Sequence, residues 1–170
     1  LSADLGLPRF THGLGVGDID GDGRADVLLK QGWWRQPESL AGDPQWEFVP
    51  FEFSARHGGA QMLVDDVDRD GDADVITSLA AHEFGLSWFE QTDGSAGRQF
   101  VEHRVMDDEP SDSPQGVKFG ELHALALADL DGDGDLDVVT GKRWWSHGAP
   151  GDPDRGEVPA VVYAFKNEPG

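Results

Sequence analysis

Cysteine is absent from this 170-residue sequence, which excludes disulfide bonds and thiol chemistry. No apolar run approaches the roughly 18 residues of a membrane-spanning helix, so we expect no membrane insertion. The chain begins at Leu1 and shows no signal peptide, so we expect a processed or excised piece of a longer protein. The motifs of serine hydrolases, zinc proteases and phosphate-binding loops are also missing, and no catalytic residue is predicted.

Basic residues are scarce, because 13 lysines and arginines face 33 aspartates and glutamates for a formal net charge of −20. Such a charge argues against nucleic acid or an anionic membrane surface as a partner. Fifteen of the aspartates lie in three short segments when Asp65, just before the second segment, is counted, so most of the acidity is local. The explanation for the charge is therefore sought in those segments.

The three acidic segments, residues 18–26, 66–74 and 129–137, all fit the pattern D-x-D-x-D-G-x-x-D. Four carboxylates held so close repel one another unless a cation lies between them, and Ca²⁺ accepts six to eight oxygen ligands. Side chains at positions 1, 3, 5 and 9 and the backbone carbonyl at position 7 would supply most of that shell. The sequence therefore predicts three calcium ions per chain. The predicted ligands are Asp18, Asp20, Asp22, Arg24 and Asp26; Asp66, Asp68, Asp70, Asp72 and Asp74; and Asp129, Asp131, Asp133, Asp135 and Asp137.

The EF-hand is the obvious alternative for such a loop, but it requires a glutamate at position 12 and a following helix. Position 12 is Leu29, Thr77 or Thr140 in the three segments. The residues that follow each loop are short and rich in β-branched side chains, which indicates strands. The EF-hand is therefore rejected.

The loops are part of a longer internal repeat. A strand-like run precedes each loop, a short β run follows it, and further strand-like runs include residues 46–53, 85–91, 99–106 and 160–167. The repeats are predicted to span about residues 11–53, 57–106 and 121–167 within one domain, 1–170. Each offers about four strands, which is the size of a β-propeller blade. The expected fold class is all-β, with three blades of four antiparallel strands per chain.

The sequence resembles the FG-GAP/VCBS repeats of integrin-like β-propellers. The three calcium loops carry this resemblance, together with phrases such as THGLGVGDIDGDGRADVL and ELHALALADLDGDGDLDVVTGKRWWSHG, which are similar to secreted bacterial members of the kind found in planctomycetes. The resemblance implies that each loop joins the first and second strands of a blade and binds one calcium ion. Arg69 stands where glycine or asparagine is common, and no clear FG…GAP segment opens the units, so the VCBS-like branch fits better.

Three blades are too few for a familiar closed ring, which has four to eight. We expect either a fragment of a larger propeller or an association of copies, in which a homodimer would close a six-bladed ring. Exposed blade edges favour some partner over a free monomer.

Histidines are the best candidates for chemistry beyond calcium. His12, His57 and His123 lie near the start of each unit's first strand, and in a propeller they would converge at the central channel. One interpretation is a transition-metal site or a general base; the other is backbone hydrogen bonding or packing. His82, in a loop beside Glu83, is expected to be structural.

The six tryptophans have two interpretations, packing between blades or stacking on sugar rings. In the Trp33–Trp34 and Trp144–Trp145 pairs, strand alternation predicts one ring facing inward and one outward. Segments 106–120 and 148–159 are expected to be surface insertions. Their Asp107, Asp108 and Glu109 are interpreted as solvated.

The function expected from these features is a calcium-stabilised, non-catalytic binding module for a glycan or a protein. A polysaccharide-active enzyme at the central channel and a structural blade fragment or designed assembly are the alternatives. Weak calcium sites would be filled where calcium is near millimolar, which favours a secreted, cell-surface or periplasmic location.

Overall fold

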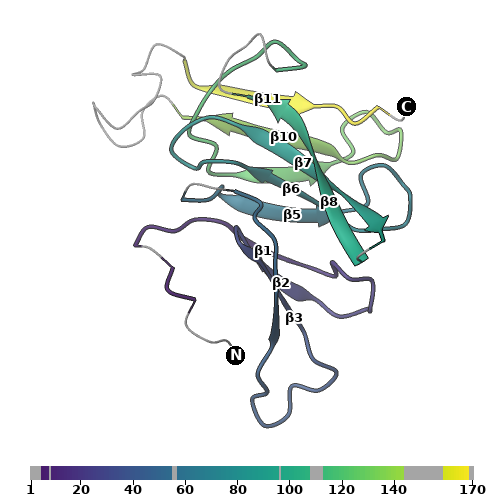
Figure 1. Cartoon of the computed structure of the whole chain (residues 1–170). Helices are drawn as coiled ribbons and strands as arrows, with labels where there is room; N and C mark the ends of the chain where they lie inside the picture. The colour runs from purple at the N-terminus through teal and green to yellow at the C-terminus, as the bar shows by residue number, and fades with distance from the viewer. Residues whose placement is uncertain are drawn as a thin grey trace.

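The computed structural model describes residues 5–7, 9–54, 57–95, 97–107, 113–143 and 159–168. These residues form eleven strands and no helix, so the expected all-β class is confirmed (Figure 1). No segment among them is a helix long and apolar enough to span a membrane. The strands are β1 (Leu14–Gly17), β2 (Asp26–Leu29), β3 (Gly32–Arg35), β4 (Glu47–Pro50), β5 (Gln61–Asp65), β6 (Asp74–Ser78), β7 (Leu86–Gly94), β8 (Gly97–Met106), β9 (Leu125–Ala128), β10 (Asp137–Lys142) and β11 (Val161–Phe165).

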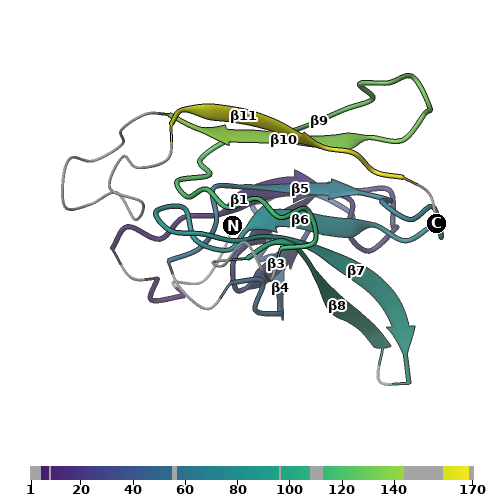
Figure 2. The same cartoon turned by 90° about the horizontal axis from the view of Figure 1, so that it is seen from above.

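Each repeat of the sequence is one antiparallel meander. An eight-stranded sheet has the order β4-β3-β2-β1-β5-β6-β7-β8, and a separate sheet has the order β11-β10-β9. The first two units thus contribute four strands each, and they meet where β1 and β5 pair in parallel over two residues of each strand. The third unit contributes three strands in the part of the chain described here, and its sheet lies beside β5 and β6 (Figures 1 and 2).

Two apolar clusters fill the space between successive units. Strand β6 shows why, because all of its five residues are buried and its neighbours Val75 and Ile76 point into different clusters. The cluster between the first and second units consists of Ile19, Leu28, Trp33, Phe53, Met62, Val75 and Phe89. The cluster between the second and third units consists of Ile76, Leu86, Met106, Phe119, Leu122, Leu125 and Phe165.

Glycines allow the first two units to approach closely. A Cβ atom at Gly15 would lie 2.5 Å from the Met62 carbonyl oxygen, and one at Gly17 would lie 2.5 Å from the Val64 Cβ, both on β5. Neither glycine has a positive φ, so it is the space around the Cβ position that excludes a larger residue. These two glycines set how tightly the sheet folds at its centre.

The tryptophans of the first unit correct one expectation. Trp33 and Trp34 are both buried, at 4% and 8% exposure, so neither ring faces outward. Trp33 packs in the cluster between units, with Phe100 at 5.9 Å, while Trp34 packs on Phe48 of β4 at 5.3 Å between ring centroids. Both faces of β3 are therefore covered. The Trp144–Trp145 pair, Asp108, Glu109 and most of segment 148–159 lie outside the described residues.

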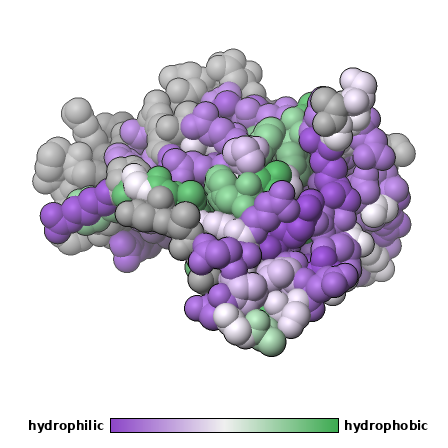
Figure 3. All heavy atoms as spheres, turned by 60° about the horizontal axis from the view of Figure 1, so that its bottom comes forward, coloured by the Kyte–Doolittle hydropathy of each residue, from purple (hydrophilic) through white to green (hydrophobic). Residues whose placement is uncertain are grey.

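Large apolar side chains also reach the surface. Leu14 and Val16 on β1 are 61% and 63% exposed, and Val162 on β11 is 81% exposed. The face in Figure 3 is mostly hydrophilic, with apolar residues gathered in a narrower band across it. Exposed apolar residues on strands are typical of surfaces that meet another part of a protein.

Candidate metal centres

Each acidic loop closes a hairpin between the first and second strands of its unit. The loops lie between β1 and β2, β5 and β6, and β9 and β10, and each of these strand pairs is antiparallel. In every loop, one carboxylate oxygen from positions 1, 3 and 5 can be chosen so that the three lie within 4.8 Å of one another. The structure therefore brings together nine of the predicted side-chain ligands, as three matching triads.

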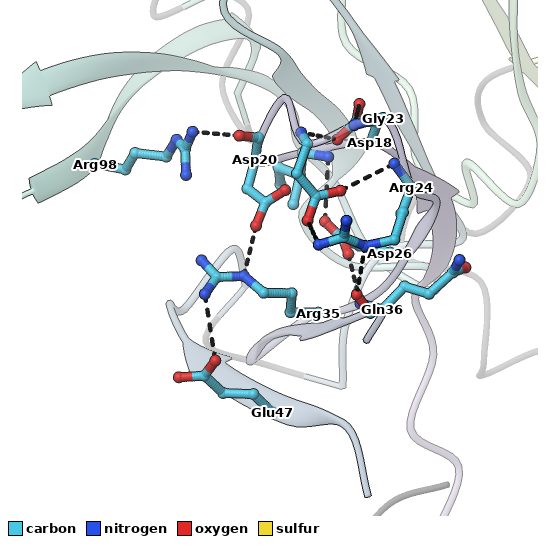
Figure 4. Close-up of polar contacts among 11 residues, drawn as sticks. Asp18, Asp20, Gly23, Arg24, Asp26, Arg35, Gln36, Glu47 and Arg98 are labelled. Atoms are coloured by element: carbon cyan, nitrogen blue, oxygen red, sulfur yellow. Dashed lines mark hydrogen bonds and ion pairs between the residues drawn. The ribbon is translucent and has the colours of Figure 1, made fainter. Parts of the chain in front are cut away.

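Local backbone bonds orient these carboxylates. The position-1 aspartate accepts the N–H of the position-6 glycine, as in Asp18 Oδ2 to Gly23 N at 2.8 Å (Figure 4). The equivalent distances are 3.1 Å for Asp66 and 3.2 Å for Asp129. Gly23, Gly71 and Gly134 have φ of 84°, 99° and 95°, which suits glycine. Bonds within the loop and the positive φ of its glycine therefore define the shape of each turn.

The position-9 aspartates, Asp26, Asp74 and Asp137, have a role that the sequence did not reveal. All three are fully buried, and both oxygens of each accept backbone N–H groups. One oxygen accepts the N–H of position 2 in its own loop. The other accepts the N–H of an amide residue, which follows the third strand for Gln36 and Asn167 and lies within it for Gln91. The distances are 3.3 and 2.8 Å for Asp26 to Ile19 and Gln36, 3.0 and 2.8 Å for Asp74 to Val67 and Gln91, and 3.1 and 3.0 Å for Asp137 to Leu130 and Asn167.

Burial raises the pKa of Asp26 and of Asp74 above the ordinary aspartate value. The backbone N–H bonds act in the opposite direction, and neighbouring aspartates add to the increase. These carboxylates therefore sit where a cation would stabilise their charged form.

The sequence did carry a signal for this arrangement. Gln36, Gln91 and Asn167 occupy the same place in three related runs, WWRQ, WFEQ and AFKN. The bonds to the position-9 aspartates come from the backbone N–H groups of these residues. The repeated amide side chain therefore identifies the position in the sequence, but it does not itself make the bond. Asn167 adds a bond of its own, from Nδ2 to the Val67 carbonyl at 2.8 Å, which joins the third unit to the second loop.

Basic side chains contact the first and third loops. Arg35 Nε lies 2.5 Å from Asp20 Oδ2 (Figure 4). Arg24 pairs with Asp22 within the same loop. Lys166 Nζ lies 2.5 Å from Asp131 Oδ2, and its hydrogen bond lowers the pKa of that carboxyl. Sequence reasoning missed Arg35 and Lys166, because Arg35 ends β3 and Lys166 follows β11, each well apart in sequence from the loop that it contacts.

The second loop differs from the other two. Among the described residues, no basic side chain pairs with Asp66, Asp68 or Asp70. Arg69, at position 4 of this loop with φ of 64°, instead pairs with Asp135 of the third loop. The second and third loops are therefore linked by an ion pair.

The donor sets fit calcium. Hard carboxylate oxygens converge in each loop, and Arg24, Asp72 and Asp135 stand at position 7, where a backbone carbonyl would contribute. Positions 1, 3 and 5 offer the convergent oxygens, while position 9 connects the loop to the sheet. Whether position 9 also ligates the ion stays a prediction.

A second group of metal-ligating side chains lies away from the acidic loops. His12, His82 and His123 each place one ring nitrogen within 4.8 Å of the others. The predicted convergence of His12, His57 and His123 is wrong for His57, whose exposed side chain lies outside this group while its carbonyl accepts the His12 N–H at 2.6 Å. His82 takes its place because the turn between β6 and β7 folds back beside the start of β1.

A protein-family model matches part of the chain. An FG-GAP repeat is found over residues 123–159, which covers the start of the third unit and its acidic loop. No curated protein matches the chain. The repeat and the β-rich fold together suggest a β-propeller-like binding module.

Proposed function

We propose that this chain is a calcium-stabilised β-propeller module that binds a glycan or a protein. The observation that carries the proposal is the threefold recurrence of one loop geometry, with aspartate triads at the same place in each unit. An ion bound at each loop would hold the hairpin between the first two strands. It would neutralise charge in a chain whose formal net charge is −20.

The three units would be blades of four strands, of the VCBS-like branch. Two units have four antiparallel strands each, and apolar clusters lie between successive units, as in the packing of blades around an axis. Three blades leave a ring incomplete, which fits a piece of a larger propeller or a dimer that closes six. A secreted or periplasmic location would supply calcium at the concentration that such loops require.

The test is a screen of glycans and extracellular proteins, run in millimolar calcium and again after chelation. We expect a ligand that binds in calcium and is lost in chelator. The Asp70→Asn variant should weaken that binding, because it removes one ligand charge from the second loop. The proposal would be overturned if the screen found no ligand in calcium while the protein measurably turned over a substrate.

A polysaccharide-active enzyme is the second candidate, and the converging histidines favour it. His82 and His123 have side chains that are 35% and 38% exposed, so a substrate could reach them. The triple variant His12→Ala, His82→Ala, His123→Ala should abolish any hydrolytic or lyase activity detected on polysaccharides. Full activity in that variant would remove this candidate.

A further inference from the structure

We propose that His12, His82 and His123 bind one first-row divalent transition-metal ion of the zinc type, separate from the calcium loops. Each histidine comes from a different unit: His12 precedes β1, His82 lies between β6 and β7, and His123 precedes β9. Imidazole nitrogen suits zinc and its neighbours, whereas calcium takes oxygen ligands. This site would therefore discriminate against the ion of the acidic loops.

The spacing of the rings matches a tetrahedral site. His12 Nε2 and His82 Nε2 are 3.2 Å apart. Two nitrogens on a tetrahedral zinc ion, at a Zn–N bond of about 2.0–2.1 Å, are about 3.3 Å apart. The three rings meet edge to face at interplanar angles of 76°, 86° and 75°, so their edges converge rather than stack.

Glu121 lies beside the other ring nitrogens of His82 and His123, at a distance longer than a hydrogen bond. Its carboxylate is buried, with the side chain 1% exposed, and Oε2 lies 3.8 Å from Nδ1 of both His82 and His123. The Nδ1 of His123 also lies 3.1 Å from the Glu121 backbone carbonyl, which leaves Nε2 for a ligand bond. A carboxylate or carbonyl on the far nitrogen is the usual outer partner of a zinc-bound histidine. Glu121 is thus a positioning residue.

Two further features suit a functional site. Glu121 has φ of 63°, a left-handed backbone that costs energy for a residue other than glycine. His12 Nδ1 is buried and has no hydrogen-bond partner among the described residues. A direct hydrogen bond between His12 and His82 is the alternative to a metal, and it would account for the 3.2 Å separation alone. It gives no reason for His123 to join them.

The test is metal binding by the stripped chain with calcium present, so that the acidic loops are filled before zinc is added. After desalting, elemental analysis should find one zinc ion per chain. Cobalt substituted for zinc should give the visible absorption bands of a four-coordinate ion. Wild-type protein that retains no zinc and shows no such bands would overturn the proposal.

The variants locate the site. His82→Ala should lower zinc affinity at least tenfold and remove the cobalt bands. The matched control, His57→Ala, should keep both, because His57 lies outside the group. If His82→Ala fails to fold, His123→Gln provides the same comparison on a side chain that is 38% exposed. Equal zinc retention by the His57 variant and the folded site variant would contradict the assignment.

The Glu121→Gln variant tests the positioning role. It should weaken zinc binding by roughly tenfold or more while the cobalt bands keep their shape, because the three ligands remain. Unchanged affinity would show that Glu121 does not support the rings. Since calcium saturates the acidic loops throughout, these results do not depend on the proposed calcium function.

Discussion

At the scale of the residue, the aspartates of one loop divide into two roles. Those at positions 1, 3 and 5 converge with one another and, apart from the buried Asp20, are at least partly exposed, whereas the position-9 aspartate is fully buried and binds two backbone N–H groups. Both kinds look alike in the sequence. The difference arises because position 9 is also the first residue of the second strand, where the sheet covers it.

This division predicts different consequences for substitution. Asp74→Ala leaves two buried N–H groups without acceptors, so it should lower the free energy of unfolding by about 2–4 kcal/mol, with or without calcium. Asp70→Ala should matter only when calcium is present, because its carboxylate is exposed and would serve the proposed ion. Urea unfolding of both variants, in calcium and in chelator, measures the difference. Equal calcium dependence in the two variants would contradict the division.

The raised pKa values of Asp26 and Asp74 predict a pH effect in metal-stripped protein. When folding raises the pKa of a carboxyl, its contribution to stability is fully present at pH values below the unfolded pKa. That contribution is lost as the pH rises through the folded pKa. The unfolding free energy should therefore fall as pH rises above the ordinary aspartate value of 3.8. Asp26→Asn should flatten that slope, and a slope identical to wild type would refute the linkage.

At the scale of the element, the sequence predicted much and for a clear reason. The loop pattern and β-branched runs located the hairpins, because turn chemistry and strand patterning are local. The grouping of His12 with His82 could not be predicted, because it depends on how the turn after β6 folds across to another unit. The same holds for Arg69 and Asp135, which lie in different loops.

The close approach of the first two units gives a prediction at this scale. Gly15→Ala places a methyl group against the Met62 carbonyl oxygen of β5, and such overpacking should cost about 1–3 kcal/mol of unfolding free energy. Gly42→Ala is the comparison, because nothing lies within 4 Å of its Cβ position and its φ of 77° alone is unfavourable. If the Gly15 variant were as stable as wild type, β1 and β5 would not be held as tightly as the structure shows.

At the scale of the whole molecule, the exposed apolar strands predict association. Two chains of 18.4 kDa would close six units, and light scattering in calcium should then give about twice that mass. Val162→Lys, at a side chain 81% exposed on the edge strand β11, should reduce the mass to that of one chain. A wild-type monomer would instead favour a piece of a longer propeller.

The central claim is that calcium bound at three repeated loops stabilises this fold. The most direct measurement is the thermal unfolding midpoint of metal-stripped protein as calcium is added, with magnesium at the same concentration as the comparison. An ion that binds only the folded state adds about 2.7 kcal/mol per site to the free energy of unfolding at 100 times its Kd, and this raises the midpoint. We predict a rise in millimolar calcium that magnesium does not reproduce. A midpoint unchanged by calcium would contradict the account.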